Sequence, residues 1–390
     1  MDIELTIEKL VFGGDGLGFV NGKACFVEGA LPQEKVLARL LVDKSNYSKA
    51  KLIRVLVPAS ERIKPPCPYV ERCGGCQYQH LPYVEELRWK QNQVRESFDQ
   101  HLKLDTVLIE SIRSAPKNYG YRNSIALHRT SVKNGIPQRL GFIGRDNRSK
   151  VLIDNCLLAD EGLRSIFSSW HTLKRSEEKR AFKLDEKNRI FTSEDEKLYK
   201  VNVGGTSLWT SSMGFFQNNL GVTELIGKQL AEWVRAIKPA HFLDLYAGVG
   251  TFPLVAAREV SEIHCFEENP YSTGCIRRNF REMNVPLSGI LTGKVEKTFP
   301  RFLIANPKPG TLVFLDPPRQ GIASSLANFL AKETDASNMI FLACDLQILL
   351  RDLRMILASG RYRIRSVVPF DMFPRTKHIE LLVWLQEIER

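Results

Sequence analysis

The sequence lacks any uncharged apolar run of the ~18 residues that a membrane-spanning helix needs. Its first residues, MDIELTIEKLVFGG, carry acids where a secretory leader would have a basic segment followed by an apolar one. Long repeats are also missing, and the 43% hydrophobic and 25% charged residues are ordinary for a globular protein. These absences argue against a membrane-embedded or largely disordered chain, and we expect a cytoplasmic protein.

Acidic residues are in deficit: 44 Asp and Glu stand against 55 Lys and Arg, which gives a formal net charge of +11. Such an excess is typical of proteins that bind polyanions. Most of it lies in residues 113–150, which hold one acid, Asp146. The nine basic residues there are Arg113, Lys117, Arg122, Arg129, Lys133, Arg139, Arg145, Arg148 and Lys150. Strand-like phrases and the rings of Tyr119 and Tyr121 are interleaved with these charges, which favours an RNA-binding sheet over a merely solvated basic face.

Eight cysteines in a chain of this length indicate metal-binding, catalytic or buried thiols rather than a disulfide framework. Four of them, Cys67-x5-Cys73-x2-Cys76 and the more distant Cys156, form a candidate metal site. Both zinc and an iron–sulfur cluster accept four thiolates. The motif has a single C-x2-C knuckle and a wide gap between its first two cysteines, which favours an iron–sulfur cluster. Zinc is the alternative. The cysteines expected to be ordinary buried thiols are Cys25, Cys265 and Cys275.

The composition changes twice along the chain, which predicts three domains. Residues 1–58 contain five short β-rich runs separated by turns, the profile of a small OB-like barrel. Residues 59–215 begin with a Pro- and Cys-rich segment, and a helix at about 84–102 that can pack on the third domain follows. The rest of this domain is mainly β, with a loop or short exposed helix at 174–187. Residues 216–390 alternate strands and helices, which predicts a doubly wound, mostly parallel α/β sheet.

Ligands in such sheets bind beyond the carboxyl ends of the strands. The strands expected in the third domain are residues 241–248, 262–269, 287–293, 311–318, 338–345, 363–371 and 378–387. The helices expected between them are residues 252–260, 271–284, 322–335 and 346–358.

A glycine-rich turn follows the first of these strands, in Asp244-Leu-Tyr-Ala-Gly248-Val-Gly250. Glu267 ends the next strand, where an acid can accept two ribose hydroxyl protons. The spacing departs from the G-x-G-x-x-G of dinucleotide sites, and Pro253 removes a backbone N–H that a pyrophosphate would use. S-adenosylmethionine, which has no phosphate, therefore fits better than NAD.

Reactive groups follow the later strands. Cys344 ends one strand beside the expected cleft, and it is placed for nucleophilic attack if cations such as Arg319 and Arg375 lower its pKa. Glu380 is either a general base or a structural carboxylate that caps the turn at Phe373.

GFFQNN, DLYAGVGTF, the strand ending at Glu267, LDPPRQG, the Cys344 strand and FPRTKHIE resemble the RNA uracil-5-methyltransferase family in order and spacing. Residues 1–58 resemble the TRAM domain of its bacterial 23S rRNA members. The resemblance implies a class I methyltransferase domain that uses S-adenosylmethionine to convert a 23S rRNA uridine to 5-methyluridine. Carried over by position, Cys344 would be the nucleophile and Glu380 the base. The cofactor contacts would be Gln217, Tyr246, Thr251, Glu267 and Asp316.

The resemblance also implies a structural [4Fe–4S] cluster, because rRNA members hold one on this cysteine motif and tRNA members generally lack it. The ligands would be Cys67, Cys73, Cys76 and Cys156. The implied mechanism is covalent: the thiolate adds to C6 of a flipped-out uridine, C5 takes the methyl group, and the base removes the C5 proton. A monomer is expected. The alternatives are the same chemistry on tRNA and a non-catalytic RNA-binding factor on a methyltransferase fold.

A few positions depart from the family pattern. Residues 343–346 are Ala-Cys-Asp-Leu instead of Ser-Cys-Asn-Pro, and Thr251 replaces an Asn. Asp345 is expected to raise the pKa of Cys344 if it is ionised nearby. Lys294 stands where an acid facing the adenine is common in such folds, so no adenine contact is assigned. None of these changes removes an essential group, and activity is expected.

Overall fold

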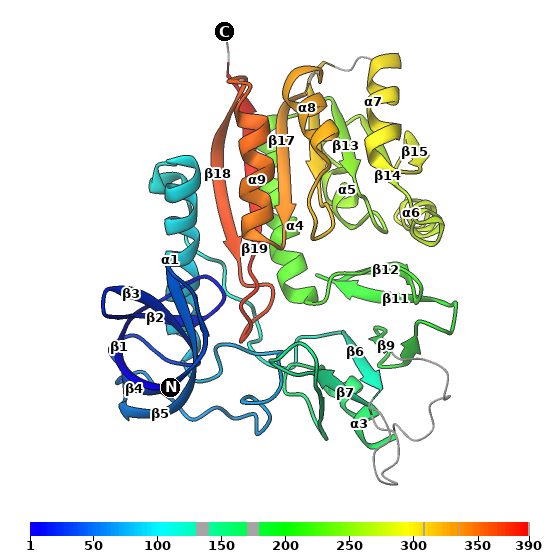
Figure 1. The fold of residues 1–390 in the computed structure, drawn as a ribbon. Helices are drawn as coiled ribbons and strands as arrows, with labels where there is room; N and C mark the ends of the chain where they lie inside the picture. The colour runs from blue at the N-terminus through cyan, green and yellow to red at the C-terminus, as the bar shows by residue number, and fades with distance from the viewer. Residues whose placement is uncertain (130–139, 170–178, 307–308, 335, 389–390) are drawn as a thin grey trace.

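Three structural parts follow one another along the chain: a barrel, a central β-rich part and a larger α/β part (Figure 1). The structure is a computed structural model, and it describes residues 1–129, 140–169, 179–306, 309–334 and 336–388. In these ranges, no helix has the length and apolar character that a membrane crossing requires.

The N-terminal barrel closes five strands in the order β1-β2-β3-β5-β4. They are β1 (Asp2–Leu10), β2 (Asp15–Val20), β3 (Lys23–Glu28), β4 (Lys35–Asp43) and β5 (Tyr47–Val57). Successive side chains of a strand point to opposite faces, so Ile3, Leu5 and Ile7 of β1 turn inward together. They pack with Cys25 and Val27 of β3. The predicted five-stranded barrel is confirmed.

Helix α1 (Tyr83–Leu102) follows the cysteine-rich segment and contacts helix α9 (Leu346–Leu357) of the α/β part. Its apolar residues Val94 and Phe98 are buried in the core of that part. Lys90 is also buried, and its ammonium group donates to Glu86 at 2.8 Å and to Asp371 at 2.6 Å. Helix α1 therefore packs on the α/β part through a face that is partly ionic.

The central part contains a five-stranded antiparallel sheet in the order β10-β9-β6-β7-β8 and a separate hairpin, β11-β12. The strands are β6 (Ser124–Arg129), β7 (Leu140–Ile143), β8 (Lys150–Leu152), β9 (Lys179–Leu184), β10 (Ile190–Thr192), β11 (Leu198–Val203) and β12 (Thr206–Ser211). The short helices are η1 (Thr106–Leu108), α2 (Glu161–Arg164) and α3 (Ile166–Ser169).

Strand β9 contradicts the loop or short helix expected at residues 174–187, whose first five residues lie outside the described ranges. Its segment KRAFKL is polar in composition but alternates in period two. Phe182 and Leu184 are buried, and Arg180 is buried in an ion pair with Glu194. The polar composition suggested a solvated segment. The alternation of buried and accessible side chains, which is typical of a strand with one buried face, is the pattern that predicts the observed structure.

The C-terminal part is a seven-stranded sheet in the order β15-β14-β13-β16-β17-β19-β18, parallel except for β19. Its strands are β13 (His241–Leu245), β14 (Glu262–Glu267), β15 (Gly289–Thr292), β16 (Thr311–Leu315), β17 (Ala336–Ala343), β18 (Tyr362–Phe370) and β19 (Glu380–Glu387). Its other helices are α4 (Leu220–Ile237), α5 (Thr251–Ala256), α6 (Pro270–Glu282), α7 (Val295–Ala305) and α8 (Ser324–Lys332). All seven predicted strands are confirmed. Helix α7 was not predicted because Pro300, which normally argues against a helix interior, lies inside it.

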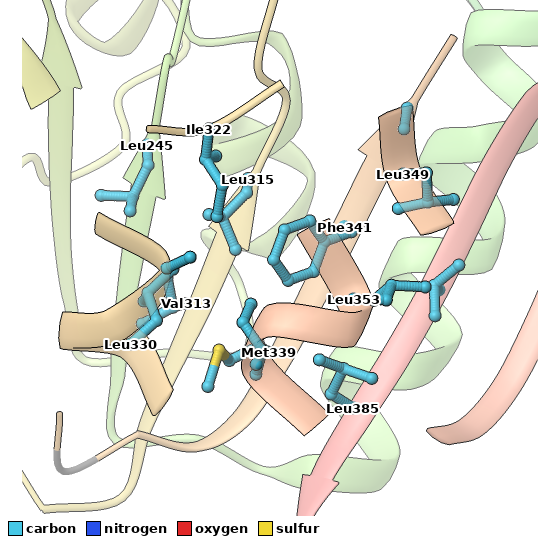
Figure 2. Packing of buried hydrophobic residues seen from close by; sticks show 14 of the residues in the cluster. Leu245, Val313, Leu315, Ile322, Leu330, Met339, Phe341, Leu349, Leu353 and Leu385 are labelled. Carbon is cyan, nitrogen blue, oxygen red and sulfur yellow. The ribbon is translucent and has the colours of Figure 1, made fainter. Parts of the chain in front are cut away.

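The apolar core fixes the strands relative to one another. Figure 2 shows Leu315 of β16 and Phe341 of β17 beside Leu349 and Leu353 of α9. A second cluster on the opposite face of the sheet is covered by α4, α5 and α6. Each buried leucine or phenylalanine contributes about 1.5–3 kcal/mol relative to an exposed one. Packing on both faces brings the carboxyl ends of β13, β14, β16 and β17 to one edge, where ligands bind in such sheets.

Candidate active site and four-thiol site

A cavity of about 750 Å³ opens at this edge of the sheet. Its volume is in the range of small-molecule sites. The predicted site residues that line it are Gln217, Tyr246, Thr251, Glu267, Asp316, Cys344 and Glu380. The structure thus brings together the predicted cofactor contacts, the predicted nucleophile and the predicted base.

One half of the cavity is built around Glu267 at the end of β14. Its two carboxylate oxygens accept hydrogen bonds from the backbone N–H of Gly248 at 2.8 Å and of Asn269 at 2.7 Å. Each oxygen keeps a lone pair for another donor, such as a ribose hydroxyl. On the same cavity, Gln217 donates from Nε2 to Asp316 Oδ2 at 3.1 Å. These bonds hold the carboxylates in fixed orientations.

Glu296 is a cavity residue that the sequence patterns did not indicate. It lies in the first turn of α7, lines the cavity beside Lys294, and accepts a hydrogen bond from the Tyr246 hydroxyl at 2.8 Å. Recognising α7 would have placed an acid here, two residues after Lys294. The exposed ring of Phe215, 69% accessible, is another lining residue that was not predicted.

The acids of the site are unusually buried. Burial raises the pKa of Asp316 to about 7, against a hydrogen bond from Gln217 that lowers it. Burial, followed by the charge of Asp316, raises the pKa of Glu380 well above its usual value, and Arg319 opposes that shift. Behind them, burial also raises the pKa of Asp244, whose oxygens have no hydrogen-bond partner within the described chain. Burial therefore keeps these carboxyl groups in their neutral forms up to a higher pH than exposed acids.

Cys344 and Glu380 are neighbours across two antiparallel strands. Ala343 at the end of β17 pairs with Leu381 of β19, so the next position along brings Cys344 opposite Glu380. Burial, with a further contribution from Glu380, raises the pKa of Cys344 to about 12, and Arg319 acts in the opposite direction. Arg319 thus lowers the pKa of this thiol as expected, but burial outweighs it and the net shift is upward.

Arg375 is not a neighbour of the nucleophile, contrary to expectation. It is buried beside α1, where its Nη1 donates to Leu81 O at 2.9 Å and its backbone N–H to Glu86 Oε1 at 2.7 Å. The guanidinium also lies over the rings of Tyr83 and Tyr119. Arg375 thus fixes the loop before β19, and of the two arginines expected beside the nucleophile Arg319 alone lines the cavity.

Two residues of this region have structural partners. Asp345 caps α9, accepting from the backbone N–H groups of Gln347 at 3.0 Å and Ile348 at 3.1 Å, and it is not among the largest contributions to the pKa of Cys344. The turn at Phe373 is closed by Thr376, whose hydroxyl donates to Phe373 O at 2.8 Å, and not by Glu380.

The four cysteines predicted as metal ligands converge in the central part. Cys67, Cys73, Cys76 and Cys156 line one pocket, and Arg122 lines it with them. Burial raises the pKa of Cys76 to about 12. Within the described ranges, no three His, Cys, Asp or Glu side chains form a group that could hold a metal ion. All eight cysteines are free thiols, and Cys25, Cys265 and Cys275 are buried as predicted.

The basic segment at 113–150 does not form one solvent-facing array. Arg122 faces the thiols, Arg113 pairs with Glu110, and Arg145 donates to the carbonyls of Val70 and Cys76. The RNA-facing role expected for Arg122 is therefore wrong. Lys133, Arg139 and the side chain of Arg129 lie outside the described part of the chain. The exposed members are Arg113, Lys117, Arg148 and Lys150.

Family models match three stretches of the chain. They are described as the TRAM domain (residues 2–53), conserved hypothetical protein 95 (residues 223–345) and tRNA (uracil-5-)-methyltransferase (residues 309–388).

Similar proteins match along almost the whole chain. An RNA methyltransferase of Bdellovibrio bacteriovorus is 30% identical and aligns over 98% of this chain and 95% of its own. The tRNA (uracil(54)-C(5))-methyltransferase of Schizosaccharomyces pombe is 28% identical over 99% of this chain and 78% of its own. A solved structure, the tRNA (uracil-54, C5)-methyltransferase of Pyrococcus abyssi with S-adenosyl-L-homocysteine, shares the fold with a TM-score of 0.73, 21% identity and coverage of 98% of this chain and 100% of its own. The chain therefore belongs to the RNA uracil-5-methyltransferase family and is an S-adenosylmethionine-dependent RNA methyltransferase.

Proposed function

We propose that the protein methylates C5 of a specific uridine in 23S rRNA, giving 5-methyluridine through a covalent adduct on Cys344. The observation that carries the proposal is the placement of Cys344 opposite Glu380 on the wall of the cavity. A nucleophile and a base on one face of a flipped uracil are what this reaction needs.

The chemistry follows from the weak nucleophilicity of uracil C5. S-adenosylmethionine supplies an electrophilic methyl group on a sulfonium. The Cys344 thiolate adds to C6, which turns C5 into the nucleophilic carbon of an enolate. After C5 has accepted the methyl group, Glu380 removes the C5 proton and the bond between C6 and Cys344 breaks. Such a base contributes about 10²–10⁴-fold, and the uridine must leave its stack to reach the cavity.

The cavity residues divide into two roles in this proposal. Glu267 orients the ribose of the cofactor, and Tyr246 and Thr251 contact the same molecule from the turn and from α5. Gln217 and Asp316 stand between cofactor and uracil. Arg319 favours the ionised forms of both Cys344 and Glu380, because it opposes the rise in the pKa of each.

Trapping of the covalent adduct tests this proposal. RNA that carries 5-fluorouridine at the target should form a stable adduct with the wild type, because fluorine cannot leave C5 as a proton. The Cys344→Ala variant should form none, whereas Cys275→Ala, at a buried thiol in α6 away from the cavity, should behave as wild type. An unchanged adduct yield with Cys344→Ala would overturn the mechanism.

We also propose a structural [4Fe–4S] cluster on Cys67, Cys73, Cys76 and Cys156. The four thiols that line one pocket are the ligand set such a group takes, and a guanidinium lies with them. No three of these side chains are grouped closely enough here to hold a metal ion, so binding would draw the thiols together. The cluster would cross-link the segment at 67–76 to the Cys156 loop. Anaerobically purified protein should be brown and contain about four iron atoms per chain, and bound zinc without visible absorbance would contradict the cluster.

A tRNA uridine is the second candidate substrate. The relatives named above from S. pombe and P. abyssi are tRNA enzymes. The second of these shares the fold over 98% of this chain, so the N-terminal barrel does not separate the two substrate classes. The four-cysteine motif remains the feature that favours rRNA. Mass mapping of 5-methyluridine in rRNA and tRNA, from cells with and without the protein, distinguishes them. Loss of a tRNA site alone would overturn the rRNA assignment.

A further inference from the structure

The guanidinium of Arg122 lies in the four-thiol pocket with an unused donor. Its Nε atom is buried and has no hydrogen-bond partner in the part of the chain that the structure describes. The group lies 5.9 Å from the centroid of the Tyr121 ring. A buried donor without an acceptor costs free energy, and a buried cation without an anion costs more. The placement is explained if the pocket holds an anionic acceptor.

The backbone holds Arg122 in this place. Its N–H donates to Leu158 O at 2.9 Å, and the N–H of Asp160 donates to Arg122 O at 3.0 Å. Leu158 lies two residues after Cys156, so these bonds clamp Arg122 to the loop that carries the fourth thiol. The side chain therefore enters the pocket from a fixed point on its wall.

The charge of the pocket is otherwise unbalanced. Of the described residues that line it, Arg122 is the one with a permanent charge. Arg145 lies close by, but its guanidinium is engaged by Glu28 and by the carbonyls of Val70 and Cys76. Thiols that bind metal give up their protons. The positive charge of an iron–sulfur core would neutralise only part of the four thiolate charges, so the metal–thiolate group would remain an anion in this enclosed space.

We propose that Arg122 is the counter-ion of the four-thiolate site, where its charge and its free Nε–H hold the metal–thiolate group. The inference rests on the proposed metal site at Cys67, Cys73, Cys76 and Cys156. A cation and an N–H···S bond favour the more negative, reduced state of a cluster, so Arg122 also raises its reduction potential.

The test compares full-length wild type with Arg122→Gln and Arg122→Lys, each reconstituted anaerobically with iron and sulfide. Arg148→Gln is the matched control, because it removes the same charge from an exposed residue of the same segment. Iron per chain, the rate of iron loss to a chelator and the midpoint potential are measured. Arg122→Gln should lose iron at least tenfold faster and favour the oxidised state tenfold, which is about 59 mV for one electron. Arg122→Lys and Arg148→Gln should stay near wild type.

Each outcome separates this inference from the proposals it rests on. Wild-type retention and potential in a folded Arg122→Gln variant would overturn the counter-ion role and leave the metal site standing. Should Arg122→Gln not fold, Arg122→Lys decides: iron loss from this folded, charge-conserving variant would equally overturn the role. Wild-type protein that takes up no metal would sink both the site and its counter-ion. Loss of methyl transfer in protein that holds its cluster would count against the methylation proposal alone.

Discussion

At the scale of single residues, the reactivity of Cys344 depends on the carboxyl group opposite it. Glu380 raises the pKa of the thiol when it is ionised, and it is also the proposed acceptor of the C5 proton. One side chain therefore hinders the first step and serves a later one. Replacing it should affect the two steps in opposite directions.

The Glu380→Gln variant separates these steps. Removing the negative charge lowers the pKa of Cys344, so the adduct with 5-fluorouridine RNA should form faster than in wild type near neutral pH. Turnover on normal RNA should fall by about 10²–10⁴-fold, the contribution of a general base. Denaturing gels measure the adduct, and transfer of labelled methyl groups measures turnover. Slower adduct formation with intact turnover would contradict the assigned roles.

The pH dependence of adduct formation has a definite sign. With its pKa raised to about 12, Cys344 is protonated over the accessible range, and the thiolate fraction rises tenfold with each pH unit. The rate in wild type should therefore increase from about pH 6 to about pH 9, past the usual thiol value near 8.5. In Glu380→Gln the same curve should be displaced to lower pH. Superimposable profiles would mean that Glu380 does not act on the thiol.

At the scale of elements, α1 and the loop before β19 are joined by buried charges. Lys90 lies between Glu86 and Asp371 and reaches Phe373 O at 3.4 Å, and Phe373 lines the cavity. Tyr83 of the same helix donates to Asp371 at 2.8 Å. The helix thereby holds the segment that leads into the proposed base.

Lys90→Met should destabilise the protein by about 3–5 kcal/mol, because it leaves the buried carboxylate of Asp371 without its cation and leaves Glu86 only the more distant Arg375, at 3.5 Å. Chemical denaturation measures this loss.

Lys9→Met is the control, since its pair with Glu96 is exposed and such pairs contribute about 0–1 kcal/mol. Burial already raises the pKa of Glu86, and removing Lys90 raises it further. The folded variant then binds the additional proton, so its deficit should shrink as pH falls. A deficit as small as that of Lys9→Met would show that the pair is not structural.

A second link joins β9 to the cofactor half of the cavity. Lys183 donates to the carbonyls of Ser212 at 2.8 Å, Ser211 at 3.4 Å and Gly214, in the turn that precedes Gln217. Lys183→Met should loosen this turn and weaken S-adenosylmethionine binding by about tenfold, or ~1.4 kcal/mol. Calorimetric titration measures the change. Lys183→Arg, which keeps the charge and donors, should recover much of the affinity, and equal affinities for all three proteins would exclude the clamp.

The features that could be predicted from the sequence are those that depend on neighbouring residues along the chain. Apolar runs and turns located the strands, and strand ends located Cys344 and Glu380, because parallel strands share one edge for their carboxyl ends. Pro300 concealed α7 and, with it, Glu296. The partner of Arg375 could not be predicted, since Glu86 lies 289 residues away and local spacing contains no record of such a contact.

At the scale of the whole molecule, the thiol pocket and the catalytic loop are directly connected. The backbone N–H groups of Gln77 and Tyr78, just after Cys76, both donate to Arg375 O, at 2.9 and 3.1 Å. The side-chain oxygen of Gln77 accepts from the N–H of Lys377 at 2.9 Å. The cysteine-bearing segment therefore supports the loop that ends at the proposed base, so the thiol site and the active site are not independent.

Lys117, Arg148 and Lys150 are exposed cations of the central part, and we expect them to hold RNA near the cavity. Replacing Lys117, Arg148 and Lys150 by Gln should weaken RNA binding and reduce the slope of log K against log salt by about 0.7 for each lost phosphate contact. Filter binding across a salt series measures both.

The matched control places the same charge change on α4 and its C-cap, at Lys228, Arg235 and Lys238, which are also exposed. If RNA responds only to net charge, the two triple variants should lose affinity equally, since each lowers the positive charge by three. If RNA lies across the central part, the first variant alone should show the lower slope, because counterion release depends on the phosphates that are contacted. If the first variant keeps the wild-type slope and the second loses RNA affinity, the RNA does not bind across the central part.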